Sequence, residues 1–256
     1  MIVKPVLTKK IDSLKVRVYE TREEMGREAG RNVKEKIHEL LDKKQNIRIV
    51  FAAAPSQNEV LQYLAEAKDI DWSKITVFHM DEYIGLPEEA PQRFGYYLSK
   101  KLFNSVKPKK VHLIDGNRSV KEECRRYAAL LQKAPIDIVC LGIGENGHIA
   151  FNDPPVADFT DLKVVKKVEM DKECRQQQVN DGCFPSIEKV PTEALTLTIP
   201  ALLSGEYLFC VVPGKSKSRA VKNVLEGPIT IECPASILRT HPQCTLYVDR
   251  DAYDGK

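Results

Sequence analysis

The sequence predicts one α/β domain over residues 1–256, with a doubly wound, mostly parallel sheet of modified Rossmann-like type and helices on both faces. Three observations lead to this prediction. Short apolar runs alternate with longer amphipathic segments along the chain, as expected for strands joined by helical crossovers. The apolar runs are nearly continuous, which is typical of strands covered on both faces. A chain of 256 residues, 43% of them hydrophobic, can bury a core of this size.

The first elements follow this alternation. KVRVYE at 15–20 is a short strand candidate, and the segment 21–44 is a long amphipathic helix. Thr21 and Glu24 form a capping-box pattern at the start of that helix, because they lie three residues apart ahead of an apolar periodicity. The run IRIVFAAA at 47–54 predicts a strand buried on both faces.

The middle of the chain repeats the order. A helix is expected at 56–68, and the strand KITVFHM at 74–80 follows it. The segment 93–106 is expected to be helical, and a short apolar strand is expected at 111–114. The amphipathic segment SVKEECRRYAALLQKA at 119–134 predicts the next helix.

The last part of the chain completes the sheet. IDIVCLGIG at 136–144 predicts a buried strand that runs into a glycine-rich loop. Residues 155–195 show little regular pattern, so we expect a lid over the site in this segment. A strand is expected at 207–214, a helix at 217–227 and the last strand at 244–249.

Composition excludes several classes of protein. Lys and Arg number 39 against 36 Asp and Glu, and this net charge of +3 gives no nucleic-acid footprint. No apolar run is long enough to span a membrane, and the N-terminus has no signal-peptide pattern. The seven cysteines include no CxxC pair, so we expect reduced thiols in a cytoplasmic protein.

Polar side chains gather where the predicted strands end. The segments 52–58, 80–86 and 142–154 each follow a strand, and Lys215 and Lys217 follow the strand at 207–214. The carboxyl ends of parallel strands lie along one edge of a sheet, where doubly wound proteins bind their ligands. The sequence therefore predicts a single small-molecule site at this edge.

Asp81 and Glu82 form a carboxylate pair at the end of an apolar strand. A carboxylate in a partly dry cleft has a raised pKa and can act as a general base. The same pair would also suit a helix N-cap or a surface turn, and the residues alone leave both interpretations open.

His148 lies in the loop LGIGENGHIAFNDPP at 141–155. A histidine titrates near neutrality and can move protons, provided that one ring nitrogen is held by an acceptor. Asp153 and Asn146 are the candidates for that acceptor. The alternative is a loop histidine bonded only to backbone.

A metal site is the weaker interpretation of these residues. His79, Asp81, Glu82, His148 and Asp153 all carry possible ligand atoms, but His79 and Asp81 lie on one face of the strand and Glu82 on the other. No Cys/His pair has zinc spacing. We therefore expect no metal.

The loop at 54–58 and the start of the helix at 217–227 are suited to an anion. A helix N-terminus presents free N–H groups and a positive dipole, and Ser56 and Gln57 add polar side chains. Lys217 adds a point charge. Because AAAPSQ contains no glycine, it is not a P-loop, and Ser56 and Lys217 would equally serve as an N-cap and a solvated lysine.

Together these residues resemble the glucosamine-6-phosphate deaminase (isomerase) family. The resemblance covers nearly the whole chain and rests on five motifs. They are FHMDEYIGLP at 78–87, LGIGENGHIAFNDP at 141–154, ALTLTIPALL at 194–203, GKSKSRAVKNVLEG at 214–227 and LRTHPQCTLYVD at 238–249. The related 6-phosphogluconolactonases share the sheet and a similar histidine loop, but DEY and AFNDP resemble the deaminase side.

The resemblance implies an aldose–ketose isomerisation with loss of ammonia from an amino-sugar phosphate, without metal or organic cofactor. It assigns Asp81 as the base that moves a proton from C2 toward C1, and His148 as the group that assists opening of the pyranose ring. Lys217 matches a phosphate-binding lysine. We also expect substrate contacts at Ser56, Gln57 and Glu82, although AAAPSQ replaces the Thr-Gly-rich phosphate loop that is usual in the family. Relatives commonly assemble, so we expect a homo-oligomer.

The sequence departs from the family pattern at several positions. Asn146 stands where the family usually has Asp, and Asp153 where it usually has Glu. Where many relatives place a phosphate-binding arginine, simple register gives Gln178, and Arg175 is the nearby substitute. These departures keep three alternatives open: a 6-phosphogluconolactonase-like hydrolase, a deaminase for another sugar phosphate such as galactosamine 6-phosphate, and a sugar-phosphate sensor without catalysis.

Overall fold

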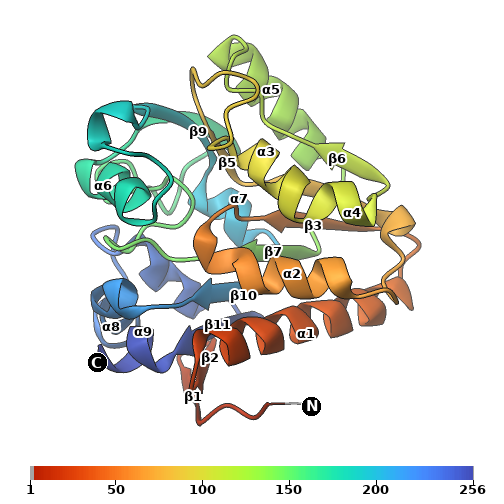
Figure 1. Ribbon diagram of the computed structural model, residues 1–256, viewed down its shortest axis with the longest axis vertical. Helices are drawn as coiled ribbons and strands as arrows, with labels where there is room; N and C mark the ends of the chain where they lie inside the picture. Colours follow the sequence, from red (N-terminus) through yellow and green to blue (C-terminus); the bar gives the residue numbers. More distant parts are fainter. Residues whose placement is uncertain (1–2, 256) are drawn as a thin grey trace.

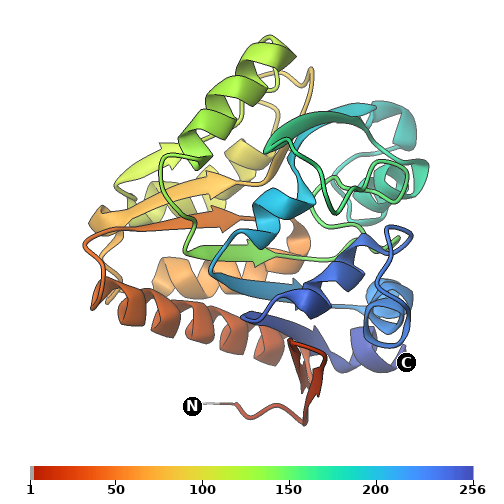
Figure 2. The same ribbon diagram turned by 180° about the vertical axis from the view of Figure 1, so that it is seen from behind.

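The computed structural model describes residues 3–255 and contains an eight-stranded sheet that confirms the predicted fold class (Figures 1 and 2). Only β1 runs antiparallel to its neighbour, and the other strand pairs are parallel. In spatial order the strands are β1 (Leu7–Ile11), β2 (Leu14–Tyr19), β11 (Cys244–Asp249), β10 (Tyr207–Val212), β7 (Ile138–Leu141), β3 (Ile47–Phe51), β4 (Ile75–His79) and β6 (Lys110–His112).

The chain changes direction across the sheet at its centre. From β3 it proceeds through β4 to β6 at one edge, and it then returns to β7, which pairs with the other side of β3. From β7 it continues through β10 to β11 toward the opposite edge. This reversal leaves a crevice beyond the carboxyl ends of β3 and β7, which is where sheets of this type bind ligands.

Helices cover both faces of the sheet and bury two apolar cores. On one face lie α1 (Arg22–Leu41), α2 (Asn58–Glu66) and α3 (Phe94–Leu98), which pack on residues such as Ile49 (Figure 1). The opposite core contains Val50, the next residue of the same strand. The helices on that face are α5 (Val120–Leu131), α7 (Ile199–Leu203), α8 (Ser218–Glu226) and α9 (Arg250–Asp254). Burial on both faces accounts for the continuous apolar runs of the sequence.

Most predicted elements are found with shifted ends. Helix α1 begins after Thr21, whose hydroxyl accepts the N–H of Glu24 at 3.2 Å, so the predicted N-cap is confirmed. The helix expected at 93–106 is one helical run that contains a π-helical turn at Ser99–Phe103 and ends with α4 (Asn104–Val106). The strand β1 and the short helices α7 and α9 were not predicted.

The segment 155–195 is more regular than the sequence predicts. It contains β8 (Val165–Glu169) and α6 (Lys172–Asn180), and the strand β9 (Glu193–Leu197) begins at its end. Strands β8 and β9 form a small antiparallel sheet with β5 (Asp81–Tyr83). The sequence shows little regular pattern here because β8 and β9 gain their order from pairing rather than from local pattern, and the role of 155–195 as a lid stays a prediction. This small sheet fixes α6 beside the carboxyl edge of the large sheet.

All seven cysteines are free thiols, as expected. Within residues 3–255, no helix combines the length and the apolar character needed to cross a membrane.

Candidate active site

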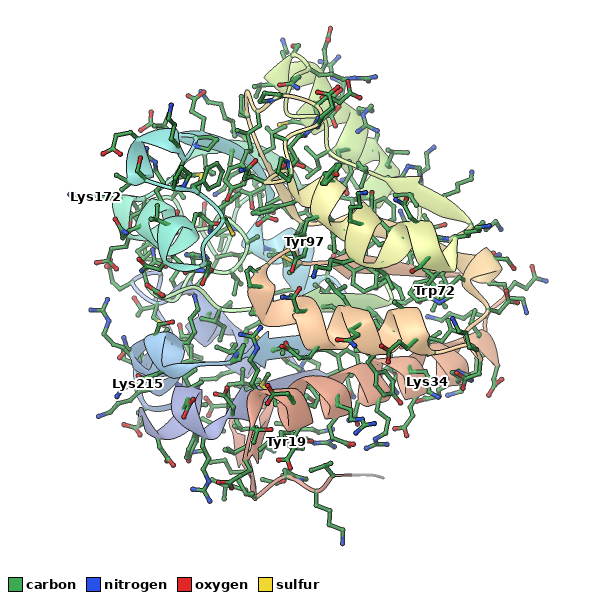
Figure 3. All side chains as sticks on the ribbon, viewed as in Figure 1. Tyr19, Lys34, Trp72, Tyr97, Lys172 and Lys215 are labelled. Carbon is green, nitrogen blue, oxygen red and sulfur yellow. The ribbon has the colours of Figure 1, made fainter. Side chains whose placement is uncertain are left out.

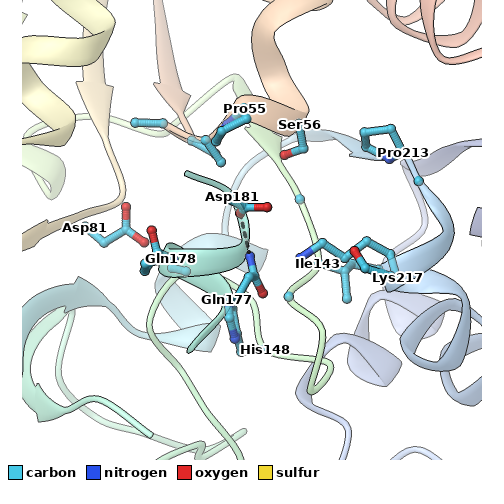
Figure 4. A pocket seen from close by; sticks show the side chains of 18 of the residues that line it. Pro55, Ser56, Asp81, Ile143, His148, Gln177, Gln178, Asp181, Pro213 and Lys217 are labelled. Atoms are coloured by element: carbon cyan, nitrogen blue, oxygen red, sulfur yellow. Dashed lines mark hydrogen bonds between the residues drawn. The ribbon is translucent and has the colours of Figure 1, made fainter. Parts of the chain in front are cut away.

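A cavity opens at the crevice between β3 and β7 (Figure 4). The loops after β3, β4, β7 and β10 supply most of its wall, and the end of α6, Arg22 of α1 and Phe94 of α3 supply the rest. The predicted site residues that line it are Ser56, Asp81, His148, Gln178 and Lys217. The convergence of four strand ends on one cavity therefore agrees with the prediction.

Asp81 begins β5 and borders the cavity with only 6% of its surface exposed. Its backbone pairs with Thr196 of β9, so the small antiparallel sheet fixes its position. Burial raises the pKa of Asp81 well above its usual value, and the neighbouring charge of Glu82 raises this pKa further. A carboxyl group with a raised pKa is a stronger base once ionised, and this environment suits a general base.

Glu82 lies on the other side of the strand and does not reach the cavity. Its carboxylate accepts the backbone N–H groups of Phe94 and Gly95 at 3.0 Å each, at the start of α3. Burial raises the pKa of Glu82 to about 7, although these hydrogen bonds oppose the rise. The expected role of Glu82 in substrate binding is therefore corrected: it caps α3, because successive side chains of a strand point to opposite faces.

His148 lines the cavity and is held from behind by two acceptors. Its Nδ1 lies 2.9 Å from Asp153 Oδ1 and 2.7 Å from Asn146 Oδ1. A proton on Nδ1 satisfies either acceptor, and Nε2 then carries the lone pair. The structure thus brings the three predicted residues together in the arrangement expected of an acid/base histidine.

Asn146 connects the histidine to the carboxylate. Its amide Nδ2 donates to Asp153 Oδ1 at 3.1 Å, and its Oδ1 also accepts the backbone N–H of His148 at 3.0 Å. The backbone N–H of Asp171 donates to Asp153 Oδ2 at 3.1 Å. Burial alone would raise the pKa of Asp153, but the charge of His148 and these hydrogen bonds hold the pKa below its usual value. A buried carboxylate with these donors stays ionised.

The glycine-rich loop is shaped around the imidazole ring. A Cβ atom added to Gly144 would lie 2.1 Å from His148 Cε1, so only glycine leaves room for the ring. Ala150 has a positive φ of 49°, which strains a residue with a side chain. Asn152 fixes the end of the loop, since its amide donates to the carbonyls of Ile149 and Leu197 at 3.0 and 2.8 Å.

Lys217 is a buried cation of the cavity lining, and Arg22, which also lines the cavity, pairs with Glu59 at 2.8 Å. Lys217 is 5% exposed, and its ammonium group is buried without a hydrogen-bond partner among the described residues. Burial lowers the pKa of Lys217 because an unpaired charge is poorly solvated there. By contrast, Lys215 lies two residues earlier at the outer surface (Figure 3). A buried ammonium that enters a cavity without a partner favours an anionic ligand.

Ser56 and Gln57 have different roles. Ser56 lines the cavity at the start of the helical turn Pro55–Gln57. Gln57 is buried behind it, and its amide Nε2 lies 3.2 Å from the carbonyl of Val211 and 3.4 Å from that of Leu141. The expected ligand contact of Gln57 is corrected, because its amide instead ties the loop after β3 to the ends of β7 and β10.

Helix α6 resolves the choice between Arg175 and Gln178. Gln178 lines the cavity and accepts the hydroxyl of Tyr83 at 2.7 Å. Arg175 points away and donates to the carbonyls of Ile187 and Val190 at 2.7 and 3.0 Å. Arg175 is therefore not a residue of this cavity, and its guanidinium fixes the chain that follows α6.

Two lining residues of α6 and its C-terminus were not predicted. Gln177 accepts the backbone N–H of Glu145 at 2.8 Å and donates to Asp181 at 3.3 Å, as the dashed line in Figure 4 shows. Asp181 completes this wall of the cavity. No local pattern marked these residues, because only the packing of α6 against the loop after β7 brings them to the site.

Of the metal ligands considered from the sequence, His148 and Asp153 meet, but His79 does not join them. His79 is fully buried and accepts the backbone N–H of Ile114 through Nε2 at 2.8 Å, and burial lowers its pKa to about 3. His79 therefore has a structural role in the protein core. Among residues 3–255, the group able to surround an ion is His148, Asp153 and Cys174.

Comparisons with known proteins agree with this geometry. The sequence profile of the family described as glucosamine-6-phosphate isomerases/6-phosphogluconolactonase matches residues 20–247. A protein of Bacillus cereus named glucosamine-6-phosphate deaminase is 33% identical over 240 residues, which cover 93% of this chain and 88% of that protein. A protein of the same name from Bacillus thuringiensis is 32% identical over 240 residues, with the same coverage of 93% and 88%.

Two solved structures with related folds superpose on this chain. One described as a monomeric glucosamine-6-phosphate deaminase superposes with a TM-score of 0.85 at 30% identity, covering 94% of this chain and 99% of that one. A 6-phosphogluconolactonase from Thermotoga maritima superposes with a TM-score of 0.76 at 22% identity, covering 93% and 100%. At this lower identity the likeness concerns the fold.

Proposed function

This chain belongs to the family of glucosamine-6-phosphate isomerases and 6-phosphogluconolactonases, and we propose that it converts glucosamine 6-phosphate and water into fructose 6-phosphate and ammonia. One observation supports this most: Asp81 and His148 border the same cavity as the unpaired ammonium of Lys217. A base, a proton-transfer group and an anion-binding cation are the parts that this reaction needs. The Bacillus relatives and the solved structure at 30% identity carry the same activity in their names.

In the proposed mechanism His148 opens the sugar ring. With Nδ1 protonated toward Asp153 or Asn146, Nε2 faces the cavity, takes the proton from O1 and delivers a proton to the ring oxygen. The ionised Asp153 stabilises the imidazolium between these two transfers. The product of this step is the open-chain aldehyde.

Asp81 then moves a proton along the sugar. Its carboxylate removes the proton from C2 and returns it to C1, while O1 gains the proton that the amino nitrogen loses, so the 2-amino aldehyde becomes an imine at C2. Water adds to this imine, and ammonia leaves with the electron pair of the C–N bond. Lys217 and Ser56 hold the phosphate at the far side of the cavity, so the sugar is oriented without a metal.

The direct test is ammonia release by the purified protein with glucosamine 6-phosphate, followed together with fructose 6-phosphate formation. We expect equal amounts of both products. If neither ammonia nor fructose 6-phosphate forms from glucosamine 6-phosphate or galactosamine 6-phosphate, the proposal is overturned. Hydrolysis of a 6-phosphogluconolactone would then favour the hydrolase, and binding without turnover would favour a sensor.

Replacing Lys217 with Met should weaken substrate binding while keeping the shape of the cavity. We expect KM for the sugar phosphate to rise about 10- to 100-fold, because a hydrogen bond to a charged group contributes about 1.5–3 kcal/mol. The variant should also melt at a higher temperature, since it removes a buried ammonium that burial disfavours. Lys215→Met, two residues away at the outer surface, is the matched control and should keep the parent KM. A parental KM in Lys217→Met would contradict this role.

The pH dependence of turnover should depend on Glu82. The base form of Asp81 exists only above its raised pKa, so turnover falls as the pH falls through that value. Glu82→Gln removes the neighbouring charge that raises this pKa, and the acid limb of the kcat profile should move to lower pH. An unshifted or upward-shifted limb would argue against Asp81 as the titrating base.

An assembly of several copies stays a prediction, which gel filtration with light scattering would check. The solved relative at 30% identity is described as monomeric. We likewise propose a cytoplasmic location.

A further inference from the structure

We propose that His148, Asp153 and Cys174 form a binding site for one thiophilic divalent cation, with Zn²⁺ as the probe, and that an ion bound there blocks the acid/base action of His148. The binding part stands on the geometry of the three side chains. The inhibition part rests on the function proposed above. Nothing in the reaction itself needs this ion.

The three side chains are already close enough to surround an ion. Each residue offers one ligand atom, and these three atoms lie within 4.8 Å of one another. They are a ring nitrogen of His148, a carboxylate oxygen of Asp153 and the thiol sulfur of Cys174. All three residues are buried. Zn²⁺ binds such atoms at about 2.0–2.3 Å in a tetrahedral arrangement. The ligands therefore need only small side-chain movements to reach bonding distance.

Charge and ligand type favour zinc over the common hard cations. The carboxylate of Asp153 and a thiolate of Cys174 carry two negative charges, which cancel those of the ion and leave a neutral buried site. A sulfur and an imidazole select zinc rather than Mg²⁺ or Ca²⁺, which prefer oxygen ligands. Because the bound thiol is deprotonated, each ion that binds near neutral pH releases the proton of Cys174.

The surroundings orient the carboxylate as they would in a metal site. Asp153 receives hydrogen bonds from the backbone N–H of Asp171 and from the amide of Asn146, both at 3.1 Å. Such outer contacts fix the direction of a ligand. Cys174 is held on α6, and His148 on the loop after β7. His148 also lines the cavity, so an ion and its fourth ligand, a water, can enter from there.

Binding of the ion would change the state of the histidine. Nδ1 faces Asp153, so it is the nitrogen that reaches the ion. The proton of Nδ1 then moves to Nε2, through solvent in the cavity, and the lone pair that ring opening requires is lost. The ion thus stops turnover without occupying the phosphate side of the cavity at Lys217.

The test measures binding and turnover separately on the full chain. Equilibrium dialysis against Zn²⁺, with a non-thiol reductant, should give one tightly bound ion per chain. Cobalt should show a thiolate-to-metal charge-transfer band. Cys174→Ser should bind zinc at least about 10- to 100-fold more weakly and lose the cobalt band. Cys183→Ser removes a nearby thiol outside the cluster and should behave as the parent.

Each result decides the proposal. Zinc that binds and inhibits the parent and Cys183→Ser, but inhibits Cys174→Ser only at much higher concentration, supports it. No zinc binding by the parent, or equal binding by Cys174→Ser, overturns it. Binding that depends on Cys174 but leaves ammonia release unchanged overturns His148 as a ligand. Because dialysis and the cobalt band need no turnover, they remain informative if the proposed deaminase activity fails.

Discussion

Asp81→Asn is expected to abolish turnover while substrate binding remains. The amide fills the same space at the start of β5 but cannot take the proton from C2, and loss of a general base typically costs about 10²- to 10⁴-fold in kcat. Lys217, the proposed phosphate ligand, lies on another element and stays in place. Turnover assayed by ammonia release, and binding measured by calorimetry, should therefore separate in this variant.

The same substitution should stabilise the protein, which distinguishes a functional carboxylate from a structural one. Burial and Glu82 raise the pKa of Asp81 in the folded state, so ionisation of Asp81 destabilises the fold as the pH rises above its unfolded pKa. The melting temperature of Asp81→Asn should exceed that of the parent, by a difference that grows with pH. Asp42→Asn, at the exposed end of α1, is the control and should change neither property. A turnover within tenfold of the parent would remove Asp81 from the role of base.

The main site residues could be predicted because the fold determines where they meet. Asp81, His148 and Lys217 are far apart in sequence, but each follows a strand of one parallel sheet. In a doubly wound sheet the carboxyl ends lie along one edge, so the order of strands and helices was enough to place them. The order of the predicted strands and helices was therefore sufficient to predict where the site lies.

The predicted site roles that the structure corrects all depend on the direction in which a side chain points. Glu82 follows Asp81 directly, and its place in a strand turns it toward α3 instead of the cavity. Gln57 and Arg175 were chosen for their chemistry, but both donate to backbone carbonyls instead. No sequence pattern indicated Cys174 as a site residue, because its thiol meets Asp153 only when α6 packs against the loop after β7. These contacts come from tertiary packing, which no local pattern records.

The departures from the family pattern are explained by a single hydrogen-bond network. Asp153 stands where the resemblance leads us to expect Glu, and it lies 2.9 Å from His148 Nδ1. Asn146 stands where the resemblance leads us to expect Asp, and its amide donates to Asp153 at 3.1 Å. A carboxylate at position 146 would instead repel Asp153 at this distance. The two substitutions therefore fit each other: the shorter acid comes close, and its neighbour becomes a donor.

His148→Ala should lower kcat for the cyclic amino sugar by about 10²- to 10⁴-fold, because the imidazole beside Gly144 is the group proposed to exchange protons with O1 and the ring oxygen. The substitution leaves a space next to Gly144 that is bordered by Asn146 and Asp153. Added imidazole fits this space and can use the same acceptors. We expect imidazole to restore part of the lost turnover.

This rescue separates proton transfer from a structural role of the ring. Imidazole should restore turnover in His148→Ala but not in Asp81→Asn, where the missing group is a carboxylate over C2. The melting temperature of each variant, measured with and without imidazole, shows whether the added ring acts on stability instead. If imidazole stabilises His148→Ala without restoring ammonia release, His148 only supports the loop. If it restores both variants equally, the gain comes from general buffer catalysis, and the ring-opening step must be assigned to another group of the cavity.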